Sequence, residues 1–221
     1  MEVLTQLQKE ILNEFPKVSE SGLFYLTGGT ALAAFYLQHR KSNDLDFFTE
    51  KEDVILPFSF RLEENLKSKG TSIERLRGLH SFVELLVKKG TEMTVIHIAQ
   101  EAPFRFEPPK EISEYSGLKI DSLTDIASNK LLALFQRATL RDFVDVYFLI
   151  KDNYFTKEKL MDLAREKDPG FDLYWFGVAL ERINFFKPNS AEMLLLIKPC
   201  TINELFIFFN NWREEISRDL K

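Results

Sequence analysis

The stretch from residue 23 to residue 48, LFYLTGGTALAAFYLQHRKSNDLDFF, constrains the fold more than any other part of this sequence. A short apolar run at 23–26, bounded by glycines, predicts a strand. Gly28 and Gly29 lack a Cβ, so the backbone can turn sharply there and approach a ligand closely. The pattern at 31–38 predicts a helix, so the stretch begins with a strand, a glycine turn and a helix.

An acid pair follows this unit in the segment DLDFF. Residues two apart in a strand point to the same face, so Asp44 and Asp46 share one face while Leu45 and Phe47 point into the core. We expect both carboxylates to face the glycine turn. Two convergent carboxylates form a site of hard oxygen ligands suited to Mg²⁺, which also binds substrate phosphates.

The helix after the glycine turn predicts an anion site. Thr30 is a suitable first residue, and the free N–H groups at a helix N-terminus favour a phosphate. We therefore expect Gly28, Gly29 and Thr30 to hold the phosphates of a nucleoside triphosphate. Arg40 and Ser42 precede the acid pair, and they either contact phosphate or shape the turn.

The remaining elements follow from apolar periodicity and from Gly and Pro positions. In the first part we expect helices at 3–15 and 57–69, strands at 72–77, 82–87, 93–98 and 118–120, and a surface loop at 101–117. The second part reads as helical, with segments at 121–137, from 139 onward, and at 157–166, 171–184 and 202–219. The predicted fold class is α+β, a mixed sheet flanked by helices, followed by a helical region packed on it.

Two blocks of residues resemble a known family. They resemble the nucleotidyltransferase fold of the DNA polymerase β type and, more closely, the AbiEii/AbiGii toxin family of nucleotidyltransferase-like proteins. The first block is Gly28-Gly29-Thr30-Ala31-Leu32, Arg40, Ser42 and Asp44-Leu45-Asp46-Phe47; the second is Asp125-Ile126, Asn129-Lys130-Leu131, Ala133-Leu134, Arg137, Arg141-Asp142-Phe143 and Asp145. The resemblance spans about the first two thirds of the chain.

The resemblance implies a fold and an activity. Residues 1–120 would form a nucleotidyltransferase-like α/β core, and residues 121–221 a helical C-terminal region. The protein would transfer an NMP group from Mg-NTP to a hydroxyl acceptor, with pyrophosphate leaving. Positioning and charge neutralisation drive such phosphoryl transfer, and two carboxylates with Mg²⁺ supply both. In related toxins the acceptor is often an RNA end, and a separate antitoxin protein is a common partner.

One part of the family pattern is missing. A third carboxylate usually comes from a neighbouring strand, but the expected strand, TEMTVIHIA at 91–99, contains no Asp. Glu84, Glu92 and His97 are the available substitutes, and strand alternation puts Glu92 and His97 on opposite faces. We favour His97, as a base or hydrogen-bond donor within an apolar strand. The alternative is a non-catalytic descendant that binds nucleotide or a protein partner.

The second block contributes two candidate cations. Lys130 and Arg137 are seven residues apart and share one face of a helix, from which they either reach the triphosphate or acceptor or remain solvated. The resemblance supports Lys130 as a catalytic residue. Asp142 is a candidate to orient either cation, while Asp145 and Arg141 have the spacing of an intrahelical ion pair.

Composition excludes several other classes. A net charge of −5 and a pI of about 5.4 argue against broad non-specific nucleic-acid binding. Three histidines form no metal-ligand spacing, and the single cysteine, Cys200, allows no intrachain disulfide. The N-terminal MEVLTQLQKE is unlike a signal peptide, and the longest apolar runs are far shorter than a membrane span. We expect a soluble cytoplasmic protein with no membrane partner.

Overall fold

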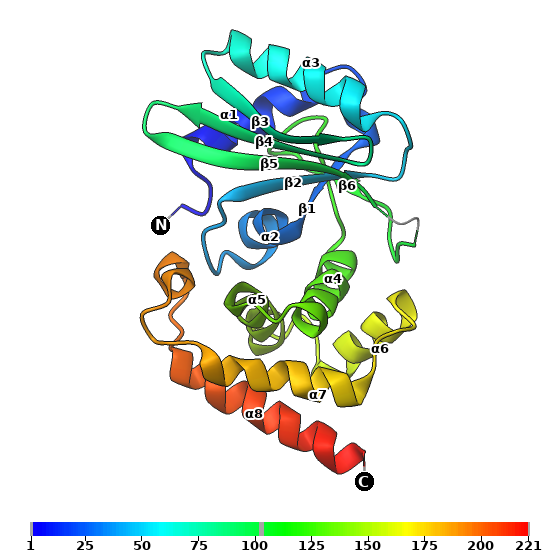
Figure 1. The fold of residues 1–221 in the computed structure, drawn as a ribbon, viewed down its shortest axis with the longest axis vertical. Helices are drawn as coiled ribbons and strands as arrows, with labels where there is room; N and C mark the ends of the chain where they lie inside the picture. Colours follow the sequence, from blue (N-terminus) through cyan, green and yellow to red (C-terminus); the bar gives the residue numbers. More distant parts are fainter. Residues whose placement is uncertain (1, 102–103, 221) are drawn as a thin grey trace. The chain divides into compact units, whose positions relative to one another are not determined.

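The computed structural model describes residues 2–101 and 104–220 and contains two compact units. The first unit consists of Met1–Tyr36 and Lys41–Ser122, and the second of Leu37–Arg40 and Leu123–Lys221. The short segment Leu37–Arg40, which precedes the acid pair in sequence, thus groups with the helices that follow residue 122 (Figure 1).

The first unit is built on a seven-stranded sheet with the strand order β3-β4-β5-β2-β1-β7-β6. Two of its pairs, β2–β5 and β1–β7, are parallel and the others are antiparallel, so the sheet is mixed, as predicted. The strands are β1 (Tyr25–Thr27), β2 (Asp44–Thr49), β3 (Ser72–Leu79), β4 (Phe82–Lys89), β5 (Glu92–Gln100), β6 (Lys110–Glu111) and β7 (Lys119–Ile120).

Helices α1 (Gln6–Glu14) and α3 (Ile55–Ser68) lie over one face of this sheet (Figure 1). The core under them is aromatic. The Phe15 ring stacks on Phe47 of β2 with 3.8 Å between centroids, and Phe24 stacks on Phe58 of α3 at 4.2 Å. The opposite face of β2 therefore remains available for polar side chains.

The second unit contains five α-helices in its described residues. They are α4 (Leu123–Gln136), α5 (Leu140–Lys151), α6 (Lys157–Lys167), α7 (Leu173–Glu181) and α8 (Ile202–Asp219). Thr139 and Asp142 form a capping box at the start of α5. Phe209 and Trp212 of α8 are buried and pack on Phe143 of α5 and Phe176 of α7. The α+β fold class predicted from the sequence is therefore confirmed.

Several predicted boundaries differ from the structure. The first strand begins at Tyr25 rather than residue 23, and the helix after it begins at Gly28 as α2 (Gly28–Ala31) before widening into a π-helix at Leu32–Leu37. Segment 101–117, predicted as a loop, contains β6, a two-residue strand that exists because it pairs with β7. Residues 102–103 of that segment lie outside the described residues.

The helices in the described parts of the chain are all too short or too polar to cross a lipid bilayer.

Candidate active site

The acid pair lies on the half-exposed face of β2. Asp44 and Asp46 alternate with Leu45 and Phe47, which are fully buried. The two carboxylates therefore share one face of the sheet, as the two-residue strand period predicts. This face is opposite the aromatic core.

The glycine turn lies directly against the second carboxylate. Thr27, the residue before the turn, is the Cα partner of Asp46. Gly28 has a φ of +72°, and a Cβ added there would overlap Oδ2 of Asp46 and come within 2.9 Å of its Cγ. Glycine is thus required twice, for the left-handed backbone and for the close approach.

Thr30 connects the turn to β2. Its side chain is fully buried, and its hydroxyl donates a hydrogen bond to the backbone carbonyl oxygen of Asp44. The hydroxyl is therefore committed to fixing the turn, and any phosphate contact at Gly28, Gly29 and Thr30 falls to the backbone N–H groups.

His97 of β5 contacts the acid pair directly. β5 runs parallel to β2 with His97 opposite Asp46, and Nδ1 of His97 lies 2.8 Å from Oδ1 of Asp46. Nε2 of the same ring lies 3.6 Å from Oε1 of Glu84 on β4. The hydrogen bond with Asp46 raises the pKa of His97 above its usual value, although burial opposes it.

Glu92, the other substitute considered for the third acid, lies elsewhere. Its Oε2 accepts a 2.6 Å hydrogen bond from the backbone N–H of Leu7, in the first turn of α1. A carboxylate there offsets the positive end of the helix dipole. Of the three substitutes, the structure brings His97 to Asp46, and Glu84 to His97.

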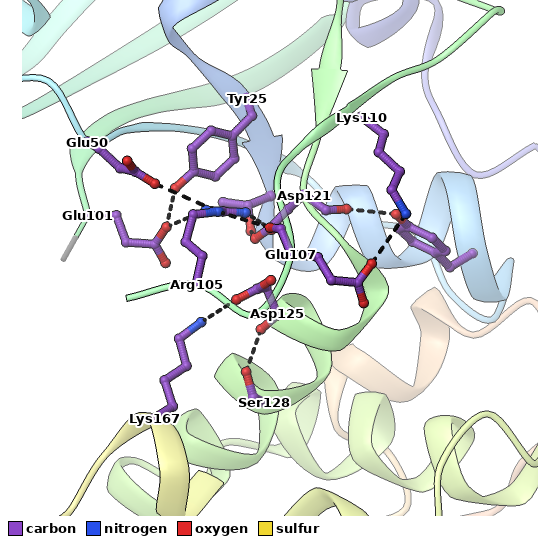
Figure 2. A network of polar contacts seen from close by, with 12 residues as sticks. Tyr25, Glu50, Glu101, Arg105, Glu107, Lys110, Asp121, Asp125, Ser128 and Lys167 are labelled. Carbon is purple, nitrogen blue, oxygen red and sulfur yellow. Dashed lines mark hydrogen bonds and ion pairs between the residues drawn. The ribbon is translucent and has the colours of Figure 1, made fainter. Parts of the chain in front are cut away.

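A polar network supports the strand that leads into the glycine turn (Figure 2). The Thr27 hydroxyl donates a 2.7 Å hydrogen bond to Oδ2 of the fully buried Asp121, which also binds the Arg105 guanidinium. Arg105 lies 4.2 Å above the Tyr25 ring and 2.9 Å from Glu101. No motif in the sequence indicated this network, because its members are far apart along the chain.

A second buried cluster, which we call the Asp145 cluster, lies within the helical unit. The fully buried Asp145 carboxylate is 2.6 Å from Nε of Arg40, 2.7 Å from Nε2 of His39 and 2.9 Å from Nζ of Lys130. Burial alone would raise the pKa of Asp145, but Arg40 and Lys130 hold it well below its usual value. Asp145 therefore forms ion pairs with residues far away in sequence. The four-residue spacing from Arg141 did not indicate these partners.

Burial lowers the pKa of His39 even though its Asp145 contact favours the charged form. The ring is fully buried, and its Nδ1 has no hydrogen-bond partner among the described residues. A neutral imidazole that donates from Nε2 to Asp145 satisfies this arrangement, because a bare nitrogen is cheaper to bury than an unpaired N–H⁺.

The other candidate residues have separate surroundings. Arg137 forms a bidentate pair with Asp142 at 2.8 and 2.9 Å, and its side chain is 57% exposed. Ser42 is buried, and its carbonyl oxygen accepts a 2.8 Å hydrogen bond from Gln8. Asp142 therefore orients Arg137, one of the two cations considered for it.

The sequence pattern of one family, described as "Nucleotidyl transferase AbiEii toxin, Type IV TA system", matches residues 10–121 and 91–193. Together these ranges cover well over half of the chain. This protein belongs to the AbiEii nucleotidyltransferase toxin family. The resemblance inferred from the glycine turn and the acid pair is confirmed.

Similar proteins occur among known sequences and among solved structures. The uncharacterized protein aq_aa25 of Aquifex aeolicus (strain VF5) is 29% identical over 200 residues, covering 89% of this chain and 91% of that protein. JHP933 from Helicobacter pylori has a TM-score of 0.58 at 21% identity, covering 97% of this chain and 90% of that one. MenT4, nucleotidyltransferase toxin Rv2826c from Mycobacterium tuberculosis H37Rv, has a TM-score of 0.53 at 16% identity, covering 96% and 84%. At these identities the structural likeness concerns the fold.

Nucleotidyltransferases of this family generally use a divalent metal ion and a nucleoside triphosphate. In the described residues no group of three or more His, Cys, Asp or Glu side chains is arranged to hold a metal ion. Mg²⁺, however, is commonly bound by one or two carboxylates together with substrate phosphates. The two carboxylates on β2 fit that mode of binding, because they lie beside a glycine turn that is too close to Asp46 to accept a Cβ at Gly28.

Proposed function

We propose that this protein transfers an NMP group from a nucleoside triphosphate to a hydroxyl acceptor. The observation that supports this most is the direct apposition of Gly28 and Oδ2 of Asp46, with Asp44 on the same face of β2. A phosphate bound at the turn is then adjacent to the acid pair. Nucleotidyl transfer needs this adjacency, because its catalysis is mainly positioning and charge neutralisation.

Asp44 and Asp46 would hold Mg²⁺, which neutralises the charge of the triphosphate when it is bound. Gly28, Gly29 and Thr30 would bind phosphate oxygens through backbone N–H groups. The hydroxyl oxygen of the acceptor would form a bond to the α-phosphorus. At the same time the bond between the α-phosphorus and the oxygen that bridges to the β-phosphorus would break. Pyrophosphate leaves, and the hydroxyl proton passes to solvent.

His97 replaces the third acid in this proposal. Its Nδ1 lies 2.8 Å from Oδ1 of Asp46. A carboxylate oxygen accepts hydrogen bonds, so Nδ1 of His97 acts as the donor in this contact. Of the two roles predicted for His97, the donor role is therefore better supported than the base.

The cations of the second block would act on the triphosphate or the acceptor. Lys130 is proposed to assist catalysis, with Asp145 fixing its ammonium at 2.9 Å. Arg40, Ser42 and Arg137 are proposed as further phosphate-binding residues. The burial of Arg40 and Ser42 and the pairing of Arg40 with Asp145 support their alternative role in shaping the turn.

RNA is the proposed acceptor and an antitoxin the proposed partner, both by analogy with the family. The rival function is a non-catalytic protein that binds nucleotide or a partner. The specific observation that favours this rival is that a histidine stands where the family fold has a carboxylate.

A labelling experiment decides between these two functions. The protein is incubated with each labelled NTP, Mg²⁺ and total RNA, and label is measured in RNA and in protein. Asp44→Asn and Asp46→Asn should abolish labelling and leave the fold intact, because both side chains are half-exposed. Asp53→Asn, the same change at a side chain that is 79% exposed, is the control and should label normally. Activity that survives in both site variants would contradict the proposal, and nucleotide binding without any transfer would support the rival.

A further inference from the structure

A row of four charged residues crosses the sheet on the same face as the acid pair. Arg77 of β3, Glu84 of β4, His97 of β5 and Asp46 of β2 occupy directly paired positions on successive strands. Directly paired residues place their side chains together on one face. We call these four residues the charged row.

The two carboxylate oxygens of Asp46 have different neighbours. Oδ1 lies 2.8 Å from Nδ1 of His97, whereas Oδ2 lies on the side of Gly28. The two oxygens are chemically equivalent, so what the hydrogen bond can fix is the plane of the carboxylate. With one oxygen held by the His97 imidazole, the other stays on the side of Gly28.

The His97 ring is held in turn by β4. Its Nε2 lies 3.6 Å from Oε1 of Glu84, and its plane stacks on the Phe82 ring with 5.7 Å between centroids and 29° between planes. The second oxygen of Glu84 lies 3.2 Å from Nε of Arg77. Both ring nitrogens of His97 therefore face carboxylates, Nδ1 within hydrogen-bond distance of Asp46 and Nε2 within ion-pair distance of Glu84.

We propose that Glu84 is a positioning residue that acts through His97, holding the imidazole so that Oδ2 of Asp46 stays aimed at the glycine turn. Asp46 binds metal only under the proposed function, and to that extent this inference rests on it. Outer partners that orient a ligand typically change metal affinity or activity by about 10- to 100-fold when they are removed. In the row of paired positions, His97 lies between Glu84 and Asp46.

Three variants test this role. Glu84→Ala removes the carboxylate, and Glu84→Gln keeps an oxygen that can accept a hydrogen bond from Nε2. Glu74→Ala is the matched control, because Glu74 is an exposed carboxylate on the same hairpin whose Cα partner is Leu86. Each is also made in a His97→Ala background, since a residue acting only through His97 has no further effect once the ring is gone.

The first measurement needs no activity. The ¹⁵N and ¹H resonances of the His97 ring are recorded without nucleotide, and they should move in Glu84→Ala and stay in place in Glu74→Ala. The second is the affinity for Mn²⁺ with ATP, followed by water-proton relaxation. The dissociation constant should rise about 10- to 100-fold in Glu84→Ala, stay near the wild-type value in Glu84→Gln, and not change further when Glu84→Ala is added to His97→Ala.

Unchanged His97 resonances in Glu84→Ala would overturn the proposal. So would a Glu84→Gln protein as impaired as Glu84→Ala, or a full additional loss of affinity in the His97→Ala background. A wild-type protein that binds no Mn²⁺ with ATP would instead contradict the proposed function, while the ring resonances still decide whether Glu84 holds His97.

Discussion

Gly28 is the residue at which backbone conformation and site geometry meet. Its φ of +72° and its contact with Asp46 impose two separate requirements on a single position. Gly70, at the end of α3, has a φ of +81° but has no atom within 4 Å of an added Cβ. The chain thus contains a glycine that imposes only the first requirement.

We expect Gly28→Ala to abolish nucleotide binding and to destabilise the protein by more than Gly70→Ala does. A left-handed conformation costs an L-residue about 1–2 kcal/mol, and this cost applies to both variants. The additional loss in Gly28→Ala comes from displacing the Asp46 carboxylate. Urea unfolding measures the stabilities, and the shift in melting temperature with Mg-ATP measures binding. A Gly28→Ala protein that binds Mg-ATP like Gly70→Ala would show that the turn does not approach the ligand.

At the scale of elements, the segment Leu37–Arg40 is attached to the helical unit by its own backbone and by the Asp145 cluster. Arg40 bridges to Leu196, and the carbonyl oxygen of His39 accepts a 2.8 Å hydrogen bond from Ile197. The fully buried Asp145 of α5 then pairs with the Arg40 side chain. Buried charges of this kind are costly unless every partner is present.

Asp145→Asn should therefore destabilise the protein by about 3–5 kcal/mol, because it leaves the charges of Arg40 and Lys130 buried without their anion. Asp162→Asn on α6 makes the same chemical change in an exposed pair with Arg165, and exposed pairs contribute only about 0–1 kcal/mol. Urea unfolding of both variants gives the comparison. Similar losses in the two would mean that the Asp145 cluster does not anchor the segment.

The same cluster predicts a pH dependence. The folded pKa of His39 is lowered by burial, so below about pH 6.5, the ordinary value, the unfolded chain binds a proton that the folded chain does not. The contribution of His39 to the free energy of unfolding is therefore complete only above that pH. It decreases as the pH falls toward the lowered folded pKa, by at most about 1.4 kcal/mol per pH unit. The free energy of unfolding is measured for the wild type and for His39→Gln between pH 7 and pH 5. The difference, wild type minus variant, should decrease as the pH falls.

His97 provides a test of the opposite sign. Its folded pKa is raised, so its stabilisation is complete below about pH 6.5 and is lost as the pH rises through the folded value. The free energy of unfolding of the wild type minus that of His97→Gln should therefore decrease as the pH rises. A slope of the same sign for both histidines would contradict the surroundings described for them.

For the whole molecule, Mg-NTP should raise the melting temperature, because a ligand that binds only the folded state stabilises it by mass action. At a ligand concentration 100 times the dissociation constant the gain is about 2.7 kcal/mol. Scanning calorimetry with each NTP, with Mg²⁺ and then with EDTA, measures it, and the Asp44→Asn protein is the control. If millimolar nucleotide with Mg²⁺ leaves the melting temperature unchanged, the site does not bind nucleotide.

Local periodicity was sufficient for most of the helices and strands and for the orientation of the acid pair. The alternation of Asp44, Leu45, Asp46 and Phe47 places the carboxylates on one face, because successive side chains of a strand point to opposite faces of the sheet. The bounds of α8, Ile202–Asp219, match the predicted helix for the same kind of reason. Each of these features depends on residues within a few positions of one another.

The neighbours of those side chains were decided by tertiary structure. His97 meets Asp46 across 51 residues of sequence because β5 pairs in parallel with β2, and strand register is set by packing of the whole sheet. Asp145 holds Arg40 across 105 residues, and β6 exists only through its pairing with β7. Sequence patterns report the local backbone, whereas a side chain's partners are selected by the long-range packing that brings distant segments together.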